Sequence, residues 1–151
     1  MIIIEDTRQQ NKKHERKHRD WKKAGDEIIR SKLVVGDYTL PPKISIDTKK
    51  DIHEIGANIC GSVDDNKRFS EECKLAKRIG CKLIILIEDK RFSSIDDLYG
   101  KAIELHSGRI IPGDQLAVAM RTLSGRYGVD FMFCKPGDTA EVVKKLLNNG
   151  K

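Results

Sequence analysis

Residues 34–50 read V-V-G-D-Y-T-L-P-P-K-I-S-I-D-T-K-K and place two carboxylates, Asp37 and Asp47, on either side of a short apolar segment. Lys49 follows the second carboxylate by two residues. If residues 44–49 form a strand, Asp47 and Lys49 point to the same face, because side chains alternate along a strand. The stretch therefore predicts that two acids and a lysine meet on one exposed edge of a sheet.

Such a trio has a chemical use. Two carboxylates a few ångströms apart repel each other unless a cation lies between them. Hard oxygen ligands favour Mg²⁺ or Mn²⁺ over zinc, and such a cation can polarise a phosphoryl oxygen and lower the pKa of a bound water. Lys49 would orient that water, help to deprotonate it, or neutralise charge in the transition state. The spacing D-x-K is also common on solvated strand faces, so the trio alone does not establish a catalytic site.

The composition narrows the class of protein. A length of 151 residues predicts one domain over residues 1–151. Lysine and arginine outnumber aspartate and glutamate by 29 to 23, and the net charge of +6 favours a polyanionic partner such as nucleic acid. The four cysteines form no C-x-x-C pair, which favours reduced thiols. No apolar run reaches the ~20 residues of a membrane helix, and no signal peptide opens the chain. We expect a cytoplasmic, intracellular protein without a membrane partner.

Hydrophobic periodicity predicts an α/β fold with three layers, in which helices flank a central mixed sheet. The expected strands are residues 1–5, 26–33, 34–40, 43–48, 82–88 and 129–134, and the expected helices are residues 11–24, 51–60, 67–79, 94–106, 114–124 and 139–147. Residues 82–88 form a continuous apolar run, which is typical of a strand buried on both faces. We expect residues 26–48 to form an antiparallel meander, with Asp37 and Asp47 on adjoining strands.

The expected helix over residues 11–24 is strongly basic and has few apolar residues, so most of its circumference should face solvent. One interpretation is a helix that faces DNA phosphates, with Lys12, Lys13 and Arg16 among its basic residues. The other is a solvated face whose lysine stems cover core atoms. Both interpretations stay open at this point.

Five short motifs, in one order, resemble the nuclease domain of the XPF family, a branch of the PD-(D/E)xK nucleases. D-T-R at residues 6–8 is similar to the family's D-x-R-E, and V-G-D-Y at residues 35–38 to its V-G-D-Y/F. D-T-K at residues 47–49 stands where the family has E-R-K. E-I-G-A-N-I at residues 54–59 and R-F-S-E-E at residues 68–72 resemble D-L-x-x-S-I and G-R-F-x-E-Q. The resemblance covers about residues 1–89 and, more loosely, the rest.

The resemblance implies a restriction-endonuclease-like fold and a Mg²⁺- or Mn²⁺-dependent endonuclease that cuts branched or flapped DNA in repair, recombination or phage DNA processing. It implies that Asp37, Asp47 and the carbonyl of Thr48 bind the metal ion, that Lys49 activates the attacking water, and that Asp6 is a supporting acid. The residues expected to contact DNA are Arg8, Lys12, Lys13, Arg16, Lys50, Lys67 and Arg68. For Arg68, an ordinary helix salt bridge to Glu71 or Glu72 is the alternative.

The chain departs from the family pattern at several positions. Gln9 and Thr48 replace a glutamate and an arginine. His53 occupies the place of the acid that follows the triad, and Glu54 stands one residue late. We expect a stand-alone form without a helix-hairpin-helix domain, bacterial or phage-encoded. Branched DNA would then be bound by this domain alone, by a homodimer formed through its apolar C-terminal helices, or by this domain together with a recruiting protein.

Two other classes of function are alternatives to the endonuclease hypothesis. A non-catalytic DNA-binding or scaffold module of the same fold is the main alternative, but the presence of Asp37, Asp47 and Lys49 favours activity. A nucleotide-binding enzyme has no support, because the sequence contains neither G-x-x-x-x-G-K-[ST] nor G-x-G-x-x-G.

Overall fold

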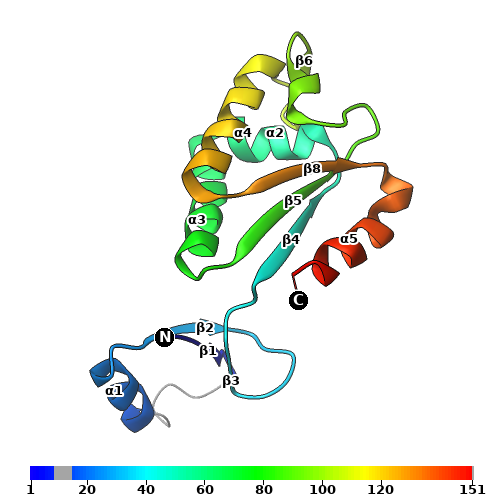
Figure 1. The fold of residues 1–151 in the computed structure, drawn as a ribbon. Helices are drawn as coiled ribbons and strands as arrows, with labels where there is room; N and C mark the ends of the chain where they lie inside the picture. The colour runs from blue at the N-terminus through cyan, green and yellow to red at the C-terminus, as the bar shows by residue number, and fades with distance from the viewer. Residues whose placement is uncertain (9–14, 151) are drawn as a thin grey trace. The chain divides into compact units, whose positions relative to one another are not determined.

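The computed structural model describes residues 1–8 and 15–150 (Figure 1). The chain forms two compact units, Met1–Pro42 and Lys43–Lys151, and each contains a three-stranded sheet. That the whole chain acts as a single nuclease domain stays a prediction.

The N-terminal unit is a mixed sheet with one helix. Its strands β1 (Ile2–Asp6), β2 (Glu27–Ser31) and β3 (Tyr38–Thr39) lie in the order β2-β1-β3. β2 pairs with β1 in parallel, whereas β3 pairs with β1 antiparallel. Helix α1 (Glu15–Lys23) lies between β1 and β2 in the chain, as a parallel pair requires a crossover connection.

Helix α1 contacts the sheet through few side chains, as its composition predicts. None of the residues Glu15–Lys23 is buried. The ring of Trp21 meets the ring of Tyr38 edge-on, at 5.1 Å between centroids. His18 Nε2 lies 2.7 Å from the buried carboxylate of Glu5, and Arg30 Nε lies 3.2 Å from the other Glu5 oxygen. The buried acid is thus paired from both the helix and β2, while the other basic residues of α1 face solvent.

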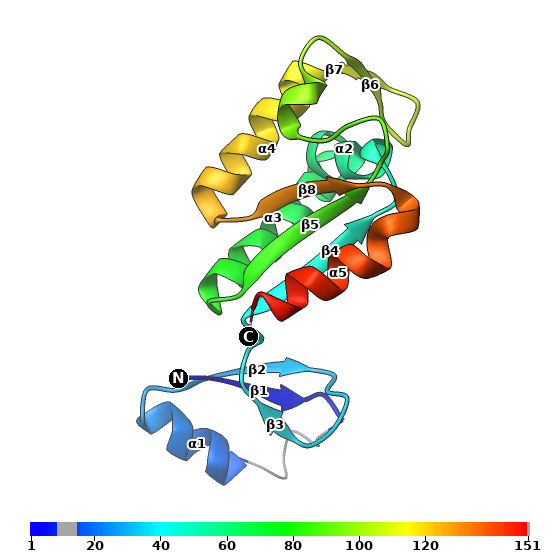
Figure 2. The ribbon, with the colours of Figure 1, turned by 45° about the vertical axis from the view of Figure 1, so that its right-hand side comes forward.

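The C-terminal unit has three layers. Its sheet is parallel and consists of β4 (Ile44–Lys49), β5 (Lys82–Glu88) and β8 (Asp130–Cys134), in the order β4-β5-β8. One face is covered by α2 (Ile52–Cys60), α3 (Val63–Arg78) and α4 (Gly113–Tyr127), and the other by α5 (Thr139–Asn148), as Figures 1 and 2 show. Short 3₁₀ helices η2 (Ile95–Leu98) and η3 (Pro136–Asp138) complete the unit.

The central strand β5 determines which side of the sheet carries the main core. Leu83, Ile85 and Ile87 join the core formed with α2, α3 and α4, whereas Ile84 and Leu86 are buried outside that core. This alternation is the period of two expected for a strand that is covered on both faces. The prediction of a strand buried on both faces over residues 82–88 is confirmed.

The predicted antiparallel meander over residues 26–48 is wrong. β2 and β3 both pair with β1, and β4 pairs in parallel with β5. Asp37 and Asp47 therefore do not come from adjoining strands. Alternation of apolar residues identifies a strand but does not choose its hydrogen-bonding partner, and here the buried run of β1 has a neighbour on each side.

The predicted helix over residues 94–106 is also wrong. The segment contains η2 and then a hairpin of β6 (Ala102–Glu104) and β7 (Ile110–Pro112). Gly100 has a φ of +76°, which ends the helical turn at little cost for glycine. Ile103 and Leu105 are buried on alternate positions, a strand period that the short apolar run did not distinguish from a helix.

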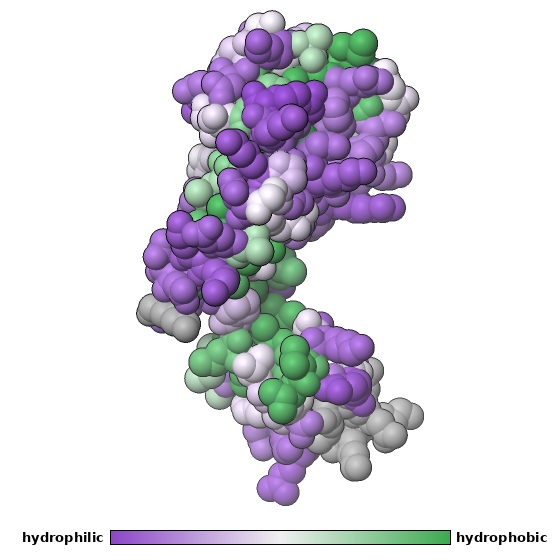
Figure 3. Space-filling view, turned by 90° about the vertical axis from the view of Figure 1, so that its right-hand side faces the viewer, coloured by the Kyte–Doolittle hydropathy of each residue, from purple (hydrophilic) through white to green (hydrophobic). Residues whose placement is uncertain are grey.

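The class predicted from the sequence, a three-layer α/β fold with flanking helices, is confirmed, although the sheet that was expected to be single and mixed is divided between the two units. Figure 3 shows hydrophilic residues over most of the visible face of the C-terminal unit. Val118 on α4 and Leu147 on α5 are exposed on the helices expected to form a dimer. Within residues 1–8 and 15–150, no helix is long and apolar enough to cross a membrane.

Candidate active site

Asp47 and Lys49 form an ion pair on one face of β4. Lys49 Nζ lies 2.8 Å from Asp47 Oδ2, and the lysine is only 12% exposed. In the register of the parallel sheet, Asp47 lies beside Ile85 and Lys49 beside Ile87. Both isoleucines belong to the core under α2, α3 and α4, so the ion pair lies on that same face. The shared face predicted by the spacing D-x-K is present.

Lys49 opens onto a cavity of about 160 Å³ between β4 and the first two helices of the unit. The cavity is lined by Lys49, Asn58, Asp65, Arg68, Phe69 and Glu72. Arg68 is exposed, and it forms no ion pair or hydrogen bond within the described part of the chain, so the salt bridge to Glu71 or Glu72 considered above is not formed. The side-chain oxygen of Asn58 is buried without a hydrogen-bond partner among the described residues.

Glu72 also lines this cavity, although the sequence motifs did not predict it as a site residue. Glu72 is an exposed residue, but partial burial of its carboxyl raises the pKa, and the negative charge of Asp47 raises it further, against the opposing charge of Lys49. Its carboxyl therefore lies within the electrostatic field of the β4 ion pair. The signal for it was present in the sequence, because Glu72 follows Arg68 by four residues and residues four apart share one face of a helix.

The N-terminal unit brings together three other residues of the predicted site. Asp6 is buried and accepts hydrogen bonds from the backbone N of Arg8 at 2.9 Å and from its Nε at 2.8 Å. These bonds from Arg8 lower the pKa of Asp6 to about 2. The same bonds to Asp6, with a small addition from the charge of Asp37, raise the pKa of Arg8, and the Asp6 backbone N donates to the carbonyl of Asp37 at 2.9 Å. Arg8 also donates to the Leu33 carbonyl at 2.9 Å.

The predicted metal ligands are therefore divided between the two units, with Asp37 in the first and Asp47 and Thr48 in the second. Their meeting stays a prediction. In residues 1–8 and 15–150, no group of three or more histidine, cysteine, aspartate or glutamate side chains is arranged to hold a metal ion.

Comparison with known proteins identifies the family. The family model described as the ERCC4 domain matches residues 5–146. The chain belongs to the ERCC4 domain family. This is a family of DNA nuclease domains. A comparison with curated proteins gives no match.

Two solved structures are similar to this ERCC4 domain, and both are XPF from Aeropyrum pernix. The first is 21% identical with a TM-score of 0.45, and the second, a complex with DNA, is 20% identical with a TM-score of 0.44. In each case the match covers 97% of this chain and 63% of the solved chain. The ERCC4 domain thus spans less than two thirds of the length of those proteins.

The residues at the start of α2 in the ERCC4 domain have structural partners. Asp51 caps the helix by accepting from Glu54 N at 2.9 Å, and Glu54 in turn accepts from Lys50 N at 2.7 Å. His53 Nδ1 contacts the carbonyl of Glu104, and its Nε2 lies 3.2 Å from an Arg91 nitrogen. His53 and Glu54 therefore hold α2 in place, and neither faces the cavity beside Lys49.

The basic residues predicted to contact DNA are distributed over both units of the ERCC4 domain. Arg16 on α1, Lys50 after β4, and Lys67 and Arg68 on α3 are exposed. Arg8 is half-exposed and is paired with Asp6. Lys12 and Lys13 lie outside the described residues. Contact of these residues with DNA stays a prediction.

We expect acid to lower the free energy of unfolding less in the Asp89→Asn variant of the ERCC4 domain than in wild type. Asp89 follows β5, is 5% exposed, and accepts from Ile52 N at the start of α2 and from Arg91. Burial alone would raise the pKa of this carboxyl, but the hydrogen bonds from Arg91 and Ile52 outweigh burial and lower it to about 2. The Asp89 carboxylate therefore stabilises the folded state fully at pH values above its ordinary pKa near 4, and this stabilisation is lost as the pH falls toward 2.

The measurement is urea unfolding at pH 7 and at pH 2.5. Wild type should lose about 1 kcal/mol more than Asp89→Asn between these values, since the charge-linked part of the Asp89 contribution is absent from the variant. Equal losses in the two proteins would show that the Asp89 carboxylate does not stabilise the folded state in this way.

Proposed function

We propose that this ERCC4 domain is a structure-specific DNA endonuclease that uses Mg²⁺ or Mn²⁺ to hydrolyse phosphodiester bonds in branched or flapped DNA, in repair, recombination or phage DNA processing. The observation that carries the proposal is the Asp47–Lys49 pair, at 2.8 Å on β4, beside a cavity that also receives Arg68. An acid, a lysine and an arginine that has no ion-pair partner among the described residues, all next to one small cavity, are the groups that phosphodiester hydrolysis needs.

The donor set fits a hard divalent cation. Asp47 uses Oδ2 in its pair with Lys49, and Oδ1 has no hydrogen-bond partner within the described residues, so one carboxylate oxygen is available as a ligand. Mg²⁺ is usually held by one or two carboxylates and keeps several waters. Asp37 and the carbonyl of Thr48 would complete the protein ligands. Asp6 would support the site indirectly, because both of its oxygens are held by Arg8.

Each side chain then has a role in the reaction. A bound Mg²⁺ or Mn²⁺ ion would polarise the scissile phosphate and lower the pKa of an attacking water. Lys49 would orient that water and neutralise charge that develops on the phosphate in the transition state. Arg68, with Lys50 and Lys67, would hold the neighbouring phosphates, because charge-assisted contacts to phosphate fix the position of the strand. The product would carry a 5′-phosphate.

The proposed enzyme would have DNA as its main partner, together with a second copy of the chain or a recruiting protein. The net charge of +6 and the exposed basic residues of α1 and α3 would attract the DNA backbone. A homodimer formed through the C-terminal helices would place two such domains on one branched substrate, and a recruiting protein is the other way to select a junction. The enzyme would act inside a bacterial or phage-infected cell.

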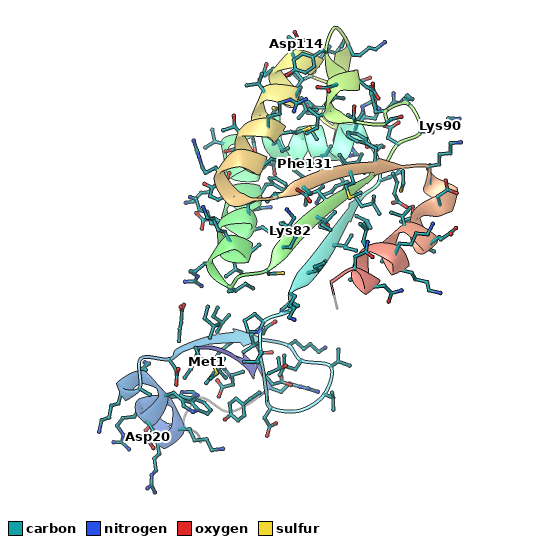
Figure 4. The ribbon with its side chains drawn as sticks, in the orientation of Figure 1. Met1, Asp20, Lys82, Lys90, Asp114 and Phe131 are labelled. Atoms are coloured by element: carbon teal, nitrogen blue, oxygen red, sulfur yellow. The ribbon has the colours of Figure 1, made fainter. Side chains whose placement is uncertain are left out.

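The test is cleavage of labelled flap, fork, four-way-junction and plain duplex DNA in Mg²⁺ or Mn²⁺, with Asp47→Ala beside wild type. Wild type should cut the branched substrates, and Asp47→Ala should lose cutting while it still binds DNA. Asp130→Ala is the matched control, because Asp130 Oδ1 pairs with Lys82 Nζ at 2.9 Å at the other end of the same sheet, where Lys82 is labelled in Figure 4.

Binding of branched DNA by folded wild type, without cutting under any of these conditions, would contradict the proposal. That result would favour the non-catalytic DNA-binding module.

A further inference from the structure

Arg91, just after β5, is an exposed arginine whose guanidinium is held by three neighbours. Its Nε and Nη2 donate to the two oxygens of the buried Asp89, at 3.0 and 2.7 Å. Nη2 also lies 3.2 Å from His53 Nε2, and the guanidinium lies over the ring of Phe92, at 5.4 Å from its centroid. Arg91 is nevertheless 51% exposed. Because a side chain that is already fixed loses less freedom on binding, this arginine is preorganised for a ligand.

The hydrogen bonds also show which part of the guanidinium remains available. His53 Nδ1 contacts the carbonyl of Glu104, and a carbonyl can only accept, so Nδ1 carries a proton. A guanidinium can only donate, so His53 Nε2 accepts from Arg91 and the imidazole is neutral. Nη1 of Arg91 forms no hydrogen bond with residues 1–8 and 15–150. Both of its N–H groups can therefore donate to an anion.

Arg91 lies near the carboxyl end of β5, beside the strand that carries Lys49. In the register of the parallel sheet Lys49 lies beside Ile87, and Asp89 follows Ile87 by two residues. Asp89 accepts from Ile52 N at 3.1 Å, so it lies on the side of the sheet that α2 covers, as Lys49 does. Ligands of open α/β sheets commonly bind outside the carboxyl ends of the strands. The position of Arg91 is therefore suitable for a substrate that also reaches Lys49.

We propose that Arg91 binds a backbone phosphate of the DNA substrate through Nη1 and so fixes the position of the strand. The inference rests on the proposed function, which supplies DNA as the ligand. Arginine presents planar N–H groups that match phosphate oxygens. Lys50, after β4, and Lys90, labelled in Figure 4 in the loop that follows β5, are exposed and would contact adjoining phosphates. Contacts of this kind position the DNA without reading its sequence.

The experiment measures binding of a labelled flap DNA to the full chain by fluorescence anisotropy, without divalent metal ions, between about 50 and 200 mM salt. The logarithm of the binding constant falls linearly with the logarithm of the salt concentration, with a slope of about 0.9 per neutralised phosphate of duplex DNA. Arg91→Gln should weaken binding about tenfold, the factor for one hydrogen bond to a charged group. It should also reduce the magnitude of the slope by about 1, because one phosphate contact is lost.

Two further variants separate the contact from its side effects. Arg91→Gln leaves the buried Asp89 carboxylate without its cation, which is destabilising. The double variant Asp89→Asn with Arg91→Gln removes both charges, keeps the net charge of wild type, and should show the same reduced slope. Arg121→Gln is the matched control, because Arg121 is 50% exposed and also pairs with an aspartate, Asp96, which is 74% exposed. It should keep the wild-type slope. Thermal melts show whether each variant is folded.

The outcomes distinguish this inference from the proposed function. If wild type binds the flap DNA and both Arg91 variants keep its affinity and slope, Arg91 is only the partner of Asp89, and the inference is overturned while the proposed endonuclease stands. Equal losses in Arg91→Gln and Arg121→Gln would show a general effect of surface charge and would also overturn it. If wild type binds no DNA, both proposals fail. Binding with the expected slopes, but no cutting in Mg²⁺ or Mn²⁺, would support the phosphate contact and contradict only the endonuclease.

Discussion

Replacement of Lys49 by methionine is expected to lower the rate of DNA cleavage by about 10²–10³-fold, with a much smaller change in DNA affinity. Lys49 is mostly buried and its Nζ lies 2.8 Å from the carboxylate of Asp47, so its charge is held beside the carboxylate that we propose as a metal ligand. Loss of one such fixed group typically costs this factor in the chemical step. Methionine keeps the apolar stem that packs beside Ile87 and removes only the charge.

Lys82→Met is the matched control for Lys49→Met. Lys82 also pairs with an aspartate of the same sheet, Asp130, at 2.9 Å, but it is 43% exposed and lies at the amino end of β5. An exposed ion pair contributes little, about 0–1 kcal/mol, to stability. Single-turnover cleavage of a labelled branched substrate measures both rates. If Lys49→Met cuts as fast as Lys82→Met, Lys49 takes no part in the chemical step and the site must be sought elsewhere.

Replacement of Gly113 by alanine is expected to lower the free energy of unfolding by about 3 kcal/mol, the upper range for overpacking a buried position. Gly113 is the buried first residue of α4, and its backbone N donates to the Lys101 carbonyl at 2.7 Å. A Cβ at this position would meet the backbone carbonyl of Leu98, which a rotamer change cannot move away. The helix start and the preceding η2 turn would have to separate.

Gly125→Ala in the same helix should have the opposite sign. An added Cβ at Gly125 has no neighbour within 4 Å, so the substitution adds only helix propensity, which raises stability by about 0.5–1 kcal/mol. Urea unfolding of the two variants measures the contrast. Equal effects of the two substitutions would show that helix propensity, and not the close approach of Leu98, decides the result at Gly113.

Several parts of this fold could be predicted because each depends on residues close in sequence. The run K-L-I-I-L-I-E identified β5 as buried on both faces, since an uninterrupted apolar strand has to be covered twice. The spacing of Asp47 and Lys49 placed both side chains on one face of β4, because the period of a strand is two. The basic composition of α1 predicted a helix that lies on the surface.

Other parts depended on distant neighbours and were mispredicted or missed. The pairing of β2 and β3 with β1, and of β4 with β5, reflects which strands pack together, and local alternation does not contain that choice. The hairpin of β6 and β7 replaced a predicted helix because a short apolar run fits both periods.

The position of Glu72 shows, within the site, the same difference between what local sequence predicts and what tertiary packing decides. The sequence by itself determined that Asp47 and Lys49 lie together on a strand, with Arg68 and Glu72 four residues apart on a helix. Only the tertiary structure placed the helix against the strand, so that Glu72 and Arg68 share a cavity with Lys49. The physical reason is that backbone geometry fixes which side chains share a face within an element, whereas burial of the core under α2, α3 and α4 decides which faces meet.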